Sequence, residues 1–308
     1  MKRFKSGNLD AIRSFPKADL HNHFVLGGNR EYLFMKSGYI IEHISKPLKS
    51  MREMDAWSAK YIGNRCNSTE GRKLLIEATF AQAKYDSVTI LEIGEDVWGL
   101  GEFFHNDIAE LIYAFQEANN KIAPEIELRL QIGLSRHCPI EYLEDCLKRF
   151  WGHKEFYSID LYGDELAQPI ENFFPIYEKA AENGLVLKAH VGEWGTAQDI
   201  VTAVKGLHLN EIQHGIAAVQ DEDVISFLAE NDIRLNLTPS SNVLLGRVPD
   251  MSDHPIAQLY RKGVNVTINS DDVLIFDSDV SKEYLRLFQS GCLTAEELDS
   301  IRLNVLRV

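Results

Sequence analysis

The chain is poor in cysteine, with only Cys66, Cys138, Cys146 and Cys292 among 308 residues. No two cysteines are spaced as C-x-x-C, so zinc-ribbon and thioredoxin-type motifs are excluded, and the spacing suits free thiols in a reducing compartment. The first fifteen residues, MKRFKSGNLDAIRSF, lack the apolar run of a signal peptide, and no stretch approaches the apolar length of a membrane span. We therefore expect a cytoplasmic protein without a membrane partner.

Positive charge is also scarce. The 46 acidic residues outnumber the 32 lysines and arginines, the formal net charge is −14, and no Lys/Arg-rich run occurs. Binding a phosphate backbone needs a basic surface, so this balance disfavours a nucleic-acid polymer as partner. A small anionic ligand stays open, because one arginine or one helix N-terminus can hold a single phosphate.

Low-complexity segments, Pro/Gly linkers and short-period repeats are absent, so we expect a single domain over residues 1–308. What recurs is an apolar, strand-like run followed by a helix-like segment. Eight such runs occur: KADLHNH (17–23), VTILEIGED (88–96), ELRLQIGLS (127–135), FYSIDLYG (156–163), GLVLKAHVGE (184–193), LNEIQHG (209–215), IRLNLTPSS (233–241) and VNVTINSDD (264–272). Alternating strands and helices predict a parallel sheet.

Amphipathic helical patterns separate most of these runs. Residues 169–184 have apolar side chains at helical spacing and end at Gly184, a C-cap signal, and residues 221–232 open with acidic residues. Eight strand–helix units in about 290 residues suit a (β/α)8 TIM barrel, with a doubly wound open sheet as the rival. The barrel is favoured because chemically capable residues end many of the runs, and a barrel gathers all strand ends at one mouth.

The gap between the first and second runs is unusually long. Residues 30–63, REYLFMKSGYIIEHISKPLKSMREMDAWSAKYIG, predict a helical insertion after the first strand, broken at Pro47. An insertion on that side of a barrel lies over the mouth, where it can act as a lid.

Histidines and carboxylates at the ends of the runs suggest a metal site. His21 and His23 are one residue apart and share one face of a strand, although two strand-end histidines can also be satisfied by hydrogen bonds alone. His190 ends another run, with Glu193 three residues later, and His214 ends a third. Asp271–Asp272 is either a helix N-cap pair or, together with the histidines, part of a hydrolytic zinc site.

Six motifs in order resemble the adenosine and AMP deaminase family. They are PKADLHNH (16–23), SIDLYGDE (158–165), HVGE (190–193), QHG (213–215), TPSSNVLLG (238–246) and INSDD (268–272). The resemblance implies hydrolytic removal of the amine at C6 of an aminopurine, with one zinc ion as cofactor. The zinc ligands that it implies are His21, His23, His190 and Asp271.

The resemblance also implies roles for other residues. Glu193, His214 and Asp271 would be catalytic: Glu193 protonates a ring nitrogen and His214 orients the attacking hydroxide. The pKa of Glu193 must then be raised by the site. Residues that would contact the substrate are Gly163, through its backbone N–H, Asp272, His23 and Arg30.

One position departs from the family pattern. Adenosine deaminases read H-L-D-G after the second histidine, and that aspartate contacts the ribose 5′-hydroxyl, whereas this chain reads HFVLGGNR with Val25 at the place of the acid. The substrate therefore stays open between an adenine nucleoside, its 5′-monophosphate (AMP or dAMP) and another aminopurine. Arg30 is either a cation for a 5′-phosphate or a surface arginine opening the next helix.

Two other classes of function stay in view. One is an amidohydrolase-type enzyme that cleaves an amide, lactone or phosphoester, which the acid at Glu193 disfavours. The other is a non-catalytic barrel that binds a purine or a partner protein, which has no need for the whole residue set. The sequence leaves the oligomeric state open, as well as whether the natural chain extends past Val308.

Overall fold

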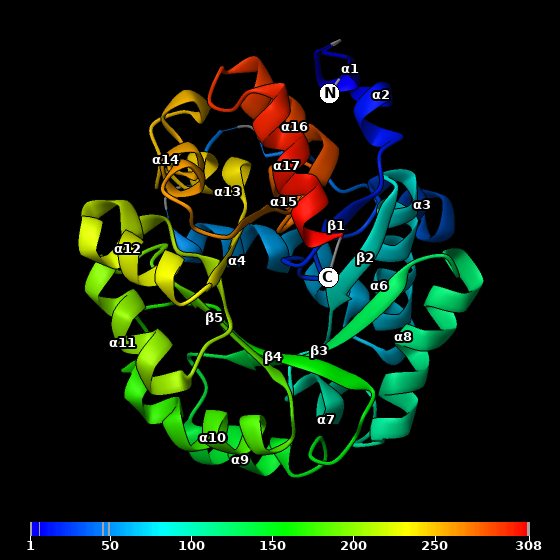
Figure 1. Cartoon of the computed structure of the whole chain (residues 1–308). Helices are drawn as coiled ribbons and strands as arrows, with labels where there is room; N and C mark the ends of the chain where they lie inside the picture. The colour runs from blue at the N-terminus through cyan, green and yellow to red at the C-terminus, as the bar shows by residue number, and fades with distance from the viewer. Residues whose placement is uncertain (1, 6, 45, 49, 307–308) are drawn as a thin grey trace.

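The structure, a computed structural model, describes residues 2–5, 7–44, 46–48 and 50–306. Eight strands form one sheet in the order β1 to β8, and every neighbouring pair is parallel. The strands are β1 (Lys17–Asp19), β2 (Val88–Ile93), β3 (Glu127–Ser135), β4 (Phe156–Tyr162), β5 (Val186–Val191), β6 (Glu211–His214), β7 (Arg234–Leu237) and β8 (Val266–Ile268). Each lies within one of the eight predicted runs, and Figure 1 shows helices surrounding them. The predicted (β/α)8 barrel is confirmed.

Burial on both faces explains why the strands read as apolar runs. Every residue of β6 and β8 is buried, and in β5 only Val186 is partly exposed. Strands of a parallel barrel are covered by helices outside and packed with side chains inside, so neither face needs polar residues.

The seam between β8 and β1 closes differently from the other strand pairs. The contact between the two segments is an isolated bridge of Asn22 with Asp271, just beyond both strands. The Asp271 N–H donates to the carbonyl of His21 over 2.9 Å, and the Leu20 N–H donates to Asn269 Oδ1 over 2.8 Å. Candidate metal ligands and their neighbours therefore close the barrel.

Helices lie between the strands and after the last of them. They are α6 (Thr69–Tyr85), α7 (Gly99–Phe103), α8 (Ile108–Ile122), α9 (Ile140–Leu147), α10 (Phe174–Glu182), α11 (Ala197–Leu207), α12 (Glu222–Glu230), α13 (Pro239–Leu244), α14 (Ile256–Arg261), α15 (Val273–Phe276), α16 (Val280–Gln289) and α17 (Ala295–Val305). Short α1 (Lys2–Lys5) and α2 (Leu9–Arg13) precede β1, and single turns η2 (Ile170–Phe173), η3 (Ile216–Gln220) and η4 (Met251–Asp253) are 3-10 helices. None of the described helices has the length and apolar character needed to traverse a bilayer.

The predicted end of α10 and the predicted start of α12 are each fixed by a capping residue. At the end of α10, Gly184 has φ +77°, and the N–H groups of Gly184 and Leu185 donate to the carbonyls of Ala181 and Ala180. Glycine tolerates this left-handed conformation, which ends the helix while satisfying its last carbonyls. The Asp221 carboxylate accepts the Asp223 N–H and so caps the start of α12.

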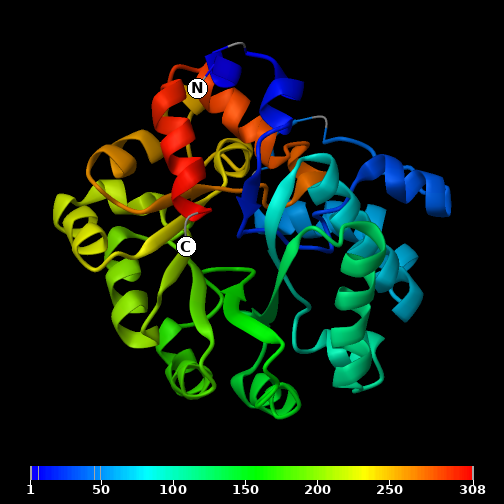
Figure 2. The ribbon, with the colours of Figure 1, turned by 45° about the vertical axis from the view of Figure 1, so that its right-hand side comes forward.

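The predicted insertion between the first two strands is confirmed as helical. It comprises α3 (Arg30–Ser37), α4 (Met51–Ser58), the π-helix η1 (Ala59–Gly63) and α5 (Asn64–Cys66), which appear in blue at the right of Figure 2. The first helix ends at Gly38, which has φ +71°, so the break begins well before Pro47. Residues 39–44, 46–48 and 50 form irregular chain, and α4 follows.

Candidate functional site

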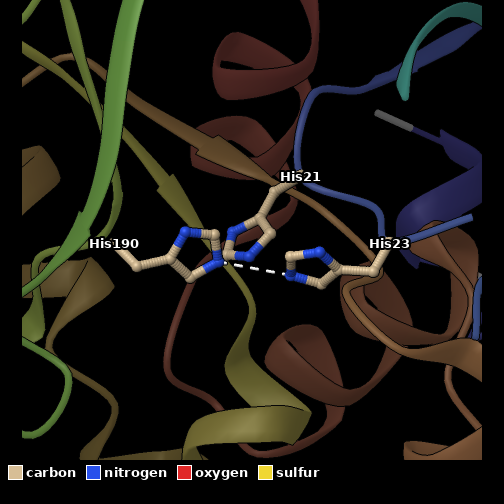
Figure 3. A group of neighbouring side chains, drawn as sticks. All are labelled: His21, His23 and His190. Atoms are coloured by element: carbon tan, nitrogen blue, oxygen red, sulfur yellow. Dashed lines mark hydrogen bonds between the residues drawn. The ribbon is translucent and has the colours of Figure 1, made fainter. Parts of the chain in front are cut away.

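Three imidazoles meet at the carboxyl ends of the strands (Figure 3). His21 and His23 follow β1, and His190 lies on β5. The Nε2 atoms of His190 and His23 are 3.2 Å apart. His21 Nδ1 lies 3.0 Å from the backbone oxygen of Asn236, while His21 Nε2 is buried and has no hydrogen-bond partner among the described residues. The His21–x–His23 spacing therefore brings two rings to one face, as the sequence predicts.

His190 is oriented by Asp160 on β4. Its Nδ1 lies 3.2 Å from Asp160 Oδ1, and Asp160 Oδ2 accepts the side-chain amide of Gln213 over 3.1 Å. Burial alone would raise the pKa of Asp160, but the neighbouring His190 holds it below its usual value. An ionised carboxylate at Nδ1 fixes the ring so that the Nε2 lone pair faces the other two imidazoles.

Asp271 approaches the same centre from the end of β8. Its Oδ1 lies 3.8 Å from His21 Nε2 and 3.6 Å from His23 Nε2. The residue has φ +60°, a left-handed conformation that is uncommon outside glycine and concentrates at functional sites. The seam hydrogen bond from the Asp271 N–H to the His21 carbonyl helps to hold it there.

These side chains fit a divalent metal ion. Their donor atoms lie within 4.8 Å of one another in three overlapping groups: His21, His23 and His190; His21, His214 and Asp271; His23, Asp271 and Asp272. Burial lowers the pKa of His21 to about 3, so its ring is neutral, as metal binding requires. The Nε2 atoms of His23 and His190, 3.2 Å apart, share a hydrogen bond in one tautomer, and both become available to a metal ion when neither carries a proton. Imidazole and carboxylate donors are also the ligand types that zinc takes in hydrolytic sites.

Glu193 lies beside this cluster and faces His214. Its Oε2 is 3.6 Å from His214 Nε2, and its Oε1 is buried without a partner in the described part of the chain. Burial, and then the charge of Asp271, raises the pKa of Glu193 to about 8. The far side of His214 is fixed, since its Nδ1 lies 3.0 Å from Thr238 Oγ1 and 3.2 Å from Asn242 Nδ2. The raised pKa of Glu193 favours the protonated form of its carboxyl group at neutral pH.

Glu165 holds the loop that carries Glu193. Its Oε1 accepts the N–H of Gly192 over 2.6 Å, and its Oε2 accepts the N–H groups of Glu193, Trp194 and Gly195 over 2.7 to 3.2 Å. The carboxylate is buried, so these four charge-assisted bonds fix the backbone that aims Glu193. Glu165 belongs to the G-D-E motif, but the motif alone does not reveal this function.

Asp272 and Gly163 complete the predicted set around the pocket. Both carboxyl oxygens of Asp272 are buried and unpartnered within the described ranges. Burial, followed by the charges of Asp271 and Glu193, raises its pKa well above the usual value. Gly163 has φ +87°, and a Cβ there would meet nothing closer than His137 Nδ1 at 3.6 Å, so the backbone conformation is what favours glycine.

A cavity of about 350 Å³ opens in front of these residues. Its size is that of a small-molecule site. Met51, Met54, Asp55 and Ser58 of α4 line it, which places part of the insertion over the mouth, as a lid requires. Val25 also lines it, so the side chain at the position of the family's aspartate does face the cavity.

Arg30 is not brought together with the other candidate residues. Among the described residues, those that line the cavity do not include it. Its Nε donates to the Ile41 carbonyl over 2.9 Å, its Nη2 donates to the Leu274 carbonyl, and its Nη1 lies 3.6 Å from Asp277 Oδ1. These contacts tie the start of α3 to the segment after β8, which is a structural role.

Several cavity residues were missed by reasoning from the sequence. The largest group lies at the ends of β2, β3 and β4 and on α6: Arg72, Glu95, Asp96, Ser135 and Tyr162. The Ser135 hydroxyl donates to Asp96 Oδ2, and the Trp98 N–H donates to Asp96 Oδ1. The signal for Glu95 and Asp96 was present, because both end the second strand-like run. Arg72 gives no local signal, since only tertiary packing brings it to the cavity.

Comparisons with known proteins show which family the chain belongs to. The family model described as adenosine deaminase matches residues 102–308. A putative adenosine/adenine deaminase of Treponema pallidum (strain Nichols) is 30% identical over 298 residues, covering 96% of this chain and 99% of its own.

Solved structures agree with the fold. An adenine deaminase from Arthrobacter aurescens superposes with a TM-score of 0.81 at 24% identity, covering 95% of this chain and 93% of its own. An amidohydrolase from Burkholderia ambifaria with bound Zn superposes with a TM-score of 0.80 at 20% identity, covering 98% of this chain and 87% of its own. The chain thus belongs to the adenosine deaminase family, and it is a hydrolase that acts on carbon–nitrogen bonds.

Proposed function

We propose that this chain is a zinc-dependent deaminase that exchanges the 6-amino group of an adenine nucleoside or related aminopurine for oxygen and releases ammonia. The observation that carries the proposal is the buried carboxyl of Glu193, 3.6 Å from His214 and beside three clustered imidazoles. An amide, lactone or phosphoester hydrolase has less need of a protonated acid at this point. The name of the Treponema pallidum relative, adenosine/adenine deaminase, supports the same reaction.

His21, His23, His190 and Asp271 would hold the zinc ion, in line with the donor atoms that they bring together. Zinc bound there would supply hydroxide at neutral pH, because it lowers the pKa of bound water to about 7. The zinc in the Burkholderia ambifaria structure supports this choice of metal.

The proton movements follow from the two residues beside that centre. Glu193 is protonated at neutral pH and would donate its proton to ring nitrogen N1, which makes C6 more electrophilic. His214 is kept neutral because burial, with the charges of nearby histidines, holds its pKa well below the usual value, so it can accept the proton of the attacking water. The C6–O bond forms, and the C6–N bond breaks as the proton taken up by His214 passes to the amine, which leaves as ammonia. The remaining hydroxyl proton returns to Glu193, and the product carries an oxo group at C6.

Asp272 and Gly163 would orient the base. A protonated Asp272 carboxyl can donate to N7 of the purine, and its unpartnered oxygens fit that function. The Gly163 N–H would donate to N3 from the opposite edge. A purely binding barrel would not need the unpartnered acid at Glu193 in addition to these contacts.

The position of Arg30 does not favour the 5′-monophosphate over the nucleoside. Arg30, the cation expected to bind a phosphate, is engaged with backbone carbonyls and Asp277 instead. We expect Arg30→Ala to lower stability by about 1–2 kcal/mol through these lost contacts and to leave the ratio of AMP to adenosine turnover unchanged. A selective loss with AMP, measured as kcat/KM on the two substrates, would restore the phosphate interpretation.

Ammonia release from zinc-loaded protein tests the function directly. The panel is adenosine, deoxyadenosine, AMP, dAMP and adenine, each with a chelator-treated control and a measured zinc content. Turnover of at least one compound, lost on chelation and recovered with zinc, is the expected result. Protein that holds zinc but turns over none of them would contradict the proposal.

A further inference from the structure

We infer that Arg72 and Glu95 form a subsite that recognises an uncharged, hydroxylated substituent on N9 of the purine. The inference rests on the proposed function, because it uses the orientation of the base in the cavity. It makes Arg72 and Glu95 specificity-determining residues, and neither was among the residues expected from the sequence.

The order of the strands around the barrel shows where the N9 substituent must point. Glu193 follows β5, Gly163 follows β4 and Asp272 follows β8. In the proposed function these residues would face N1, N3 and N7 of the purine, respectively. Around the edge of a purine, N9 lies between N3 and N7. The strands between β4 and β8 on that side are β3, β2 and β1. A substituent on N9 therefore extends toward the ends of these three strands and the lid helix α4.

Two unsatisfied groups lie in that part of the cavity. Arg72, on α6, is 6% exposed and lines the cavity, with its guanidinium carbon 3.9 Å above the ring of Phe103. Its Nε has no hydrogen-bond partner in the part of the chain that the structure describes. Glu95 is 2% exposed, and its Oε2 also lacks a partner there. The two atoms are 3.6 Å apart, too far for a hydrogen bond.

The arrangement favours a hydroxyl group over the alternatives. A hydroxyl both accepts and donates, so it can take a hydrogen bond from Arg72 while giving one to Glu95. An unsubstituted N9 would leave both buried groups unpaired, which is costly. A phosphate would meet an arginine already beside Glu95, with the carboxyl groups of Asp96 and Asp55 lining the same space.

Glu95 is held in place from two further sides. Its Oε1 accepts the Asp96 N–H over 3.1 Å, and a Cβ at Gly99 on α7 would lie 2.6 Å from its carboxyl carbon. The close approach of Gly99 leaves the carboxylate little freedom to turn away from the cavity. The acceptor is therefore positioned before a ligand arrives.

The test compares three substrates on the zinc-loaded protein: adenosine, adenine and AMP. We expect kcat/KM for adenosine to exceed that for adenine and that for AMP by about 10- to 100-fold, as one or two hydrogen bonds to charged groups predict. Equal values for adenosine and adenine, or a preference for AMP, would overturn the subsite. Absence of turnover with every compound would overturn the proposed function and the subsite together.

Substitutions of Arg72 and Glu95 then test whether these two residues cause the preference for adenosine over adenine. Arg72→Lys keeps the charge but loses the planar donor geometry, and Glu95→Gln keeps the shape but not the charge. Each should reduce the adenosine-to-adenine ratio of kcat/KM about 10-fold, whereas Arg149→Met, at an exposed position, should keep the wild-type ratio. Binding of inosine and hypoxanthine by calorimetry gives the same comparison without turnover. Variants that melt like the wild type and keep its ratio would refute the assignment.

Discussion

The floor and the rim of the pocket differ in what fixes their polar side chains, although both contain buried atoms without partners among the described residues. At the floor, the outer ring nitrogens of His21, His190 and His214 each lie within 3.2 Å of a fixed protein partner. At the rim, Arg72 and Glu95 have buried atoms without partners in the described chain, and the rim helix α4 has no buried residue. The orientation of the imidazole rings at the floor is therefore fixed before substrate binds, whereas the unpartnered atoms of Arg72 and Glu95 would gain their partner from the substrate.

Beneath the floor lies a layer of buried charged residues that are paired with one another. The Lys188 ammonium is fully buried, 2.7 Å from Glu92 Oε1 and 3.0 Å from Glu211 Oε2, and it also donates to the Leu20 carbonyl next to His21. Buried ion pairs of this geometry fix the groups around them. Substitutions at the floor should therefore change catalysis steeply, and those at the rim should change substrate choice.

The largest effect is expected from Glu193→Gln. The amide has nearly the same shape as the protonated carboxyl but has no acidic proton to donate, so we expect kcat to fall by about 10²- to 10⁴-fold. Zinc content and melting temperature should stay those of the wild type. A variant that keeps more than a tenth of the wild-type kcat would exclude Glu193 as the acid and weaken the contrast between floor and rim.

A smaller effect, on zinc affinity, is expected at Asp160, which contacts the candidate ligand His190. Asp160→Asn removes the charge that orients His190, and partners of metal-bound histidines are worth about 10- to 100-fold in metal affinity. Titration of the apoprotein with zinc against a chromogenic chelator measures this directly. Asp145→Asn, at an exposed ion pair with Lys148, is the control. Equal zinc affinities in both variants would show that Asp160 does not orient the ligand.

The third prediction concerns Glu165. Glu165→Gln places an amide donor against a backbone N–H, so at least one charge-assisted bond is lost, at a cost of about 1.5–3 kcal/mol in unfolding free energy. Because the loop aims Glu193, kcat should fall about 10-fold while KM changes little. Urea unfolding and steady-state kinetics separate the two effects, with exposed Glu171→Gln as control. Lost stability with an unchanged kcat would limit Glu165 to a structural role.

The smallest effect is expected at the rim, at Met54. Its side chain lines the cavity but is only partly buried, so Met54→Ala should change unfolding free energy by no more than about 0.5 kcal/mol. We expect KM to rise a few-fold, because the lid loses contact area with the substrate, and kcat to stay within two-fold. A fall in kcat comparable to that of the Glu165 variant would mean that the rim takes part in organising the floor.

The sequence predicts the floor better than the rim for a physical reason. His21 and His23 directly follow β1, and a parallel barrel brings the strand ends to one mouth, so the order of strand-like runs predicts that the residues ending them meet. Asp160 escaped notice because it lies inside a strand-like run, and Arg72 because α6 reaches the cavity only through tertiary packing. Arg30 was expected near a phosphate because of its position in the chain, yet its side chain turns to Ile41 and Leu274. The single domain over residues 1–308 and the cytoplasmic location stay predictions.

The seam between β8 and β1 has a consequence for the order of events during synthesis. The Ser270 N–H donates to Asp19 Oδ1 across 251 residues, next to the histidines that begin the site and the aspartates that end it. At typical ribosomal rates of about 5–20 residues per second, roughly 10 to 50 s pass between the appearance of these two ends. The nascent chain cannot assemble its reactive centre during that interval, so a product interrupted before Asp271 lacks part of the candidate site and should be inert.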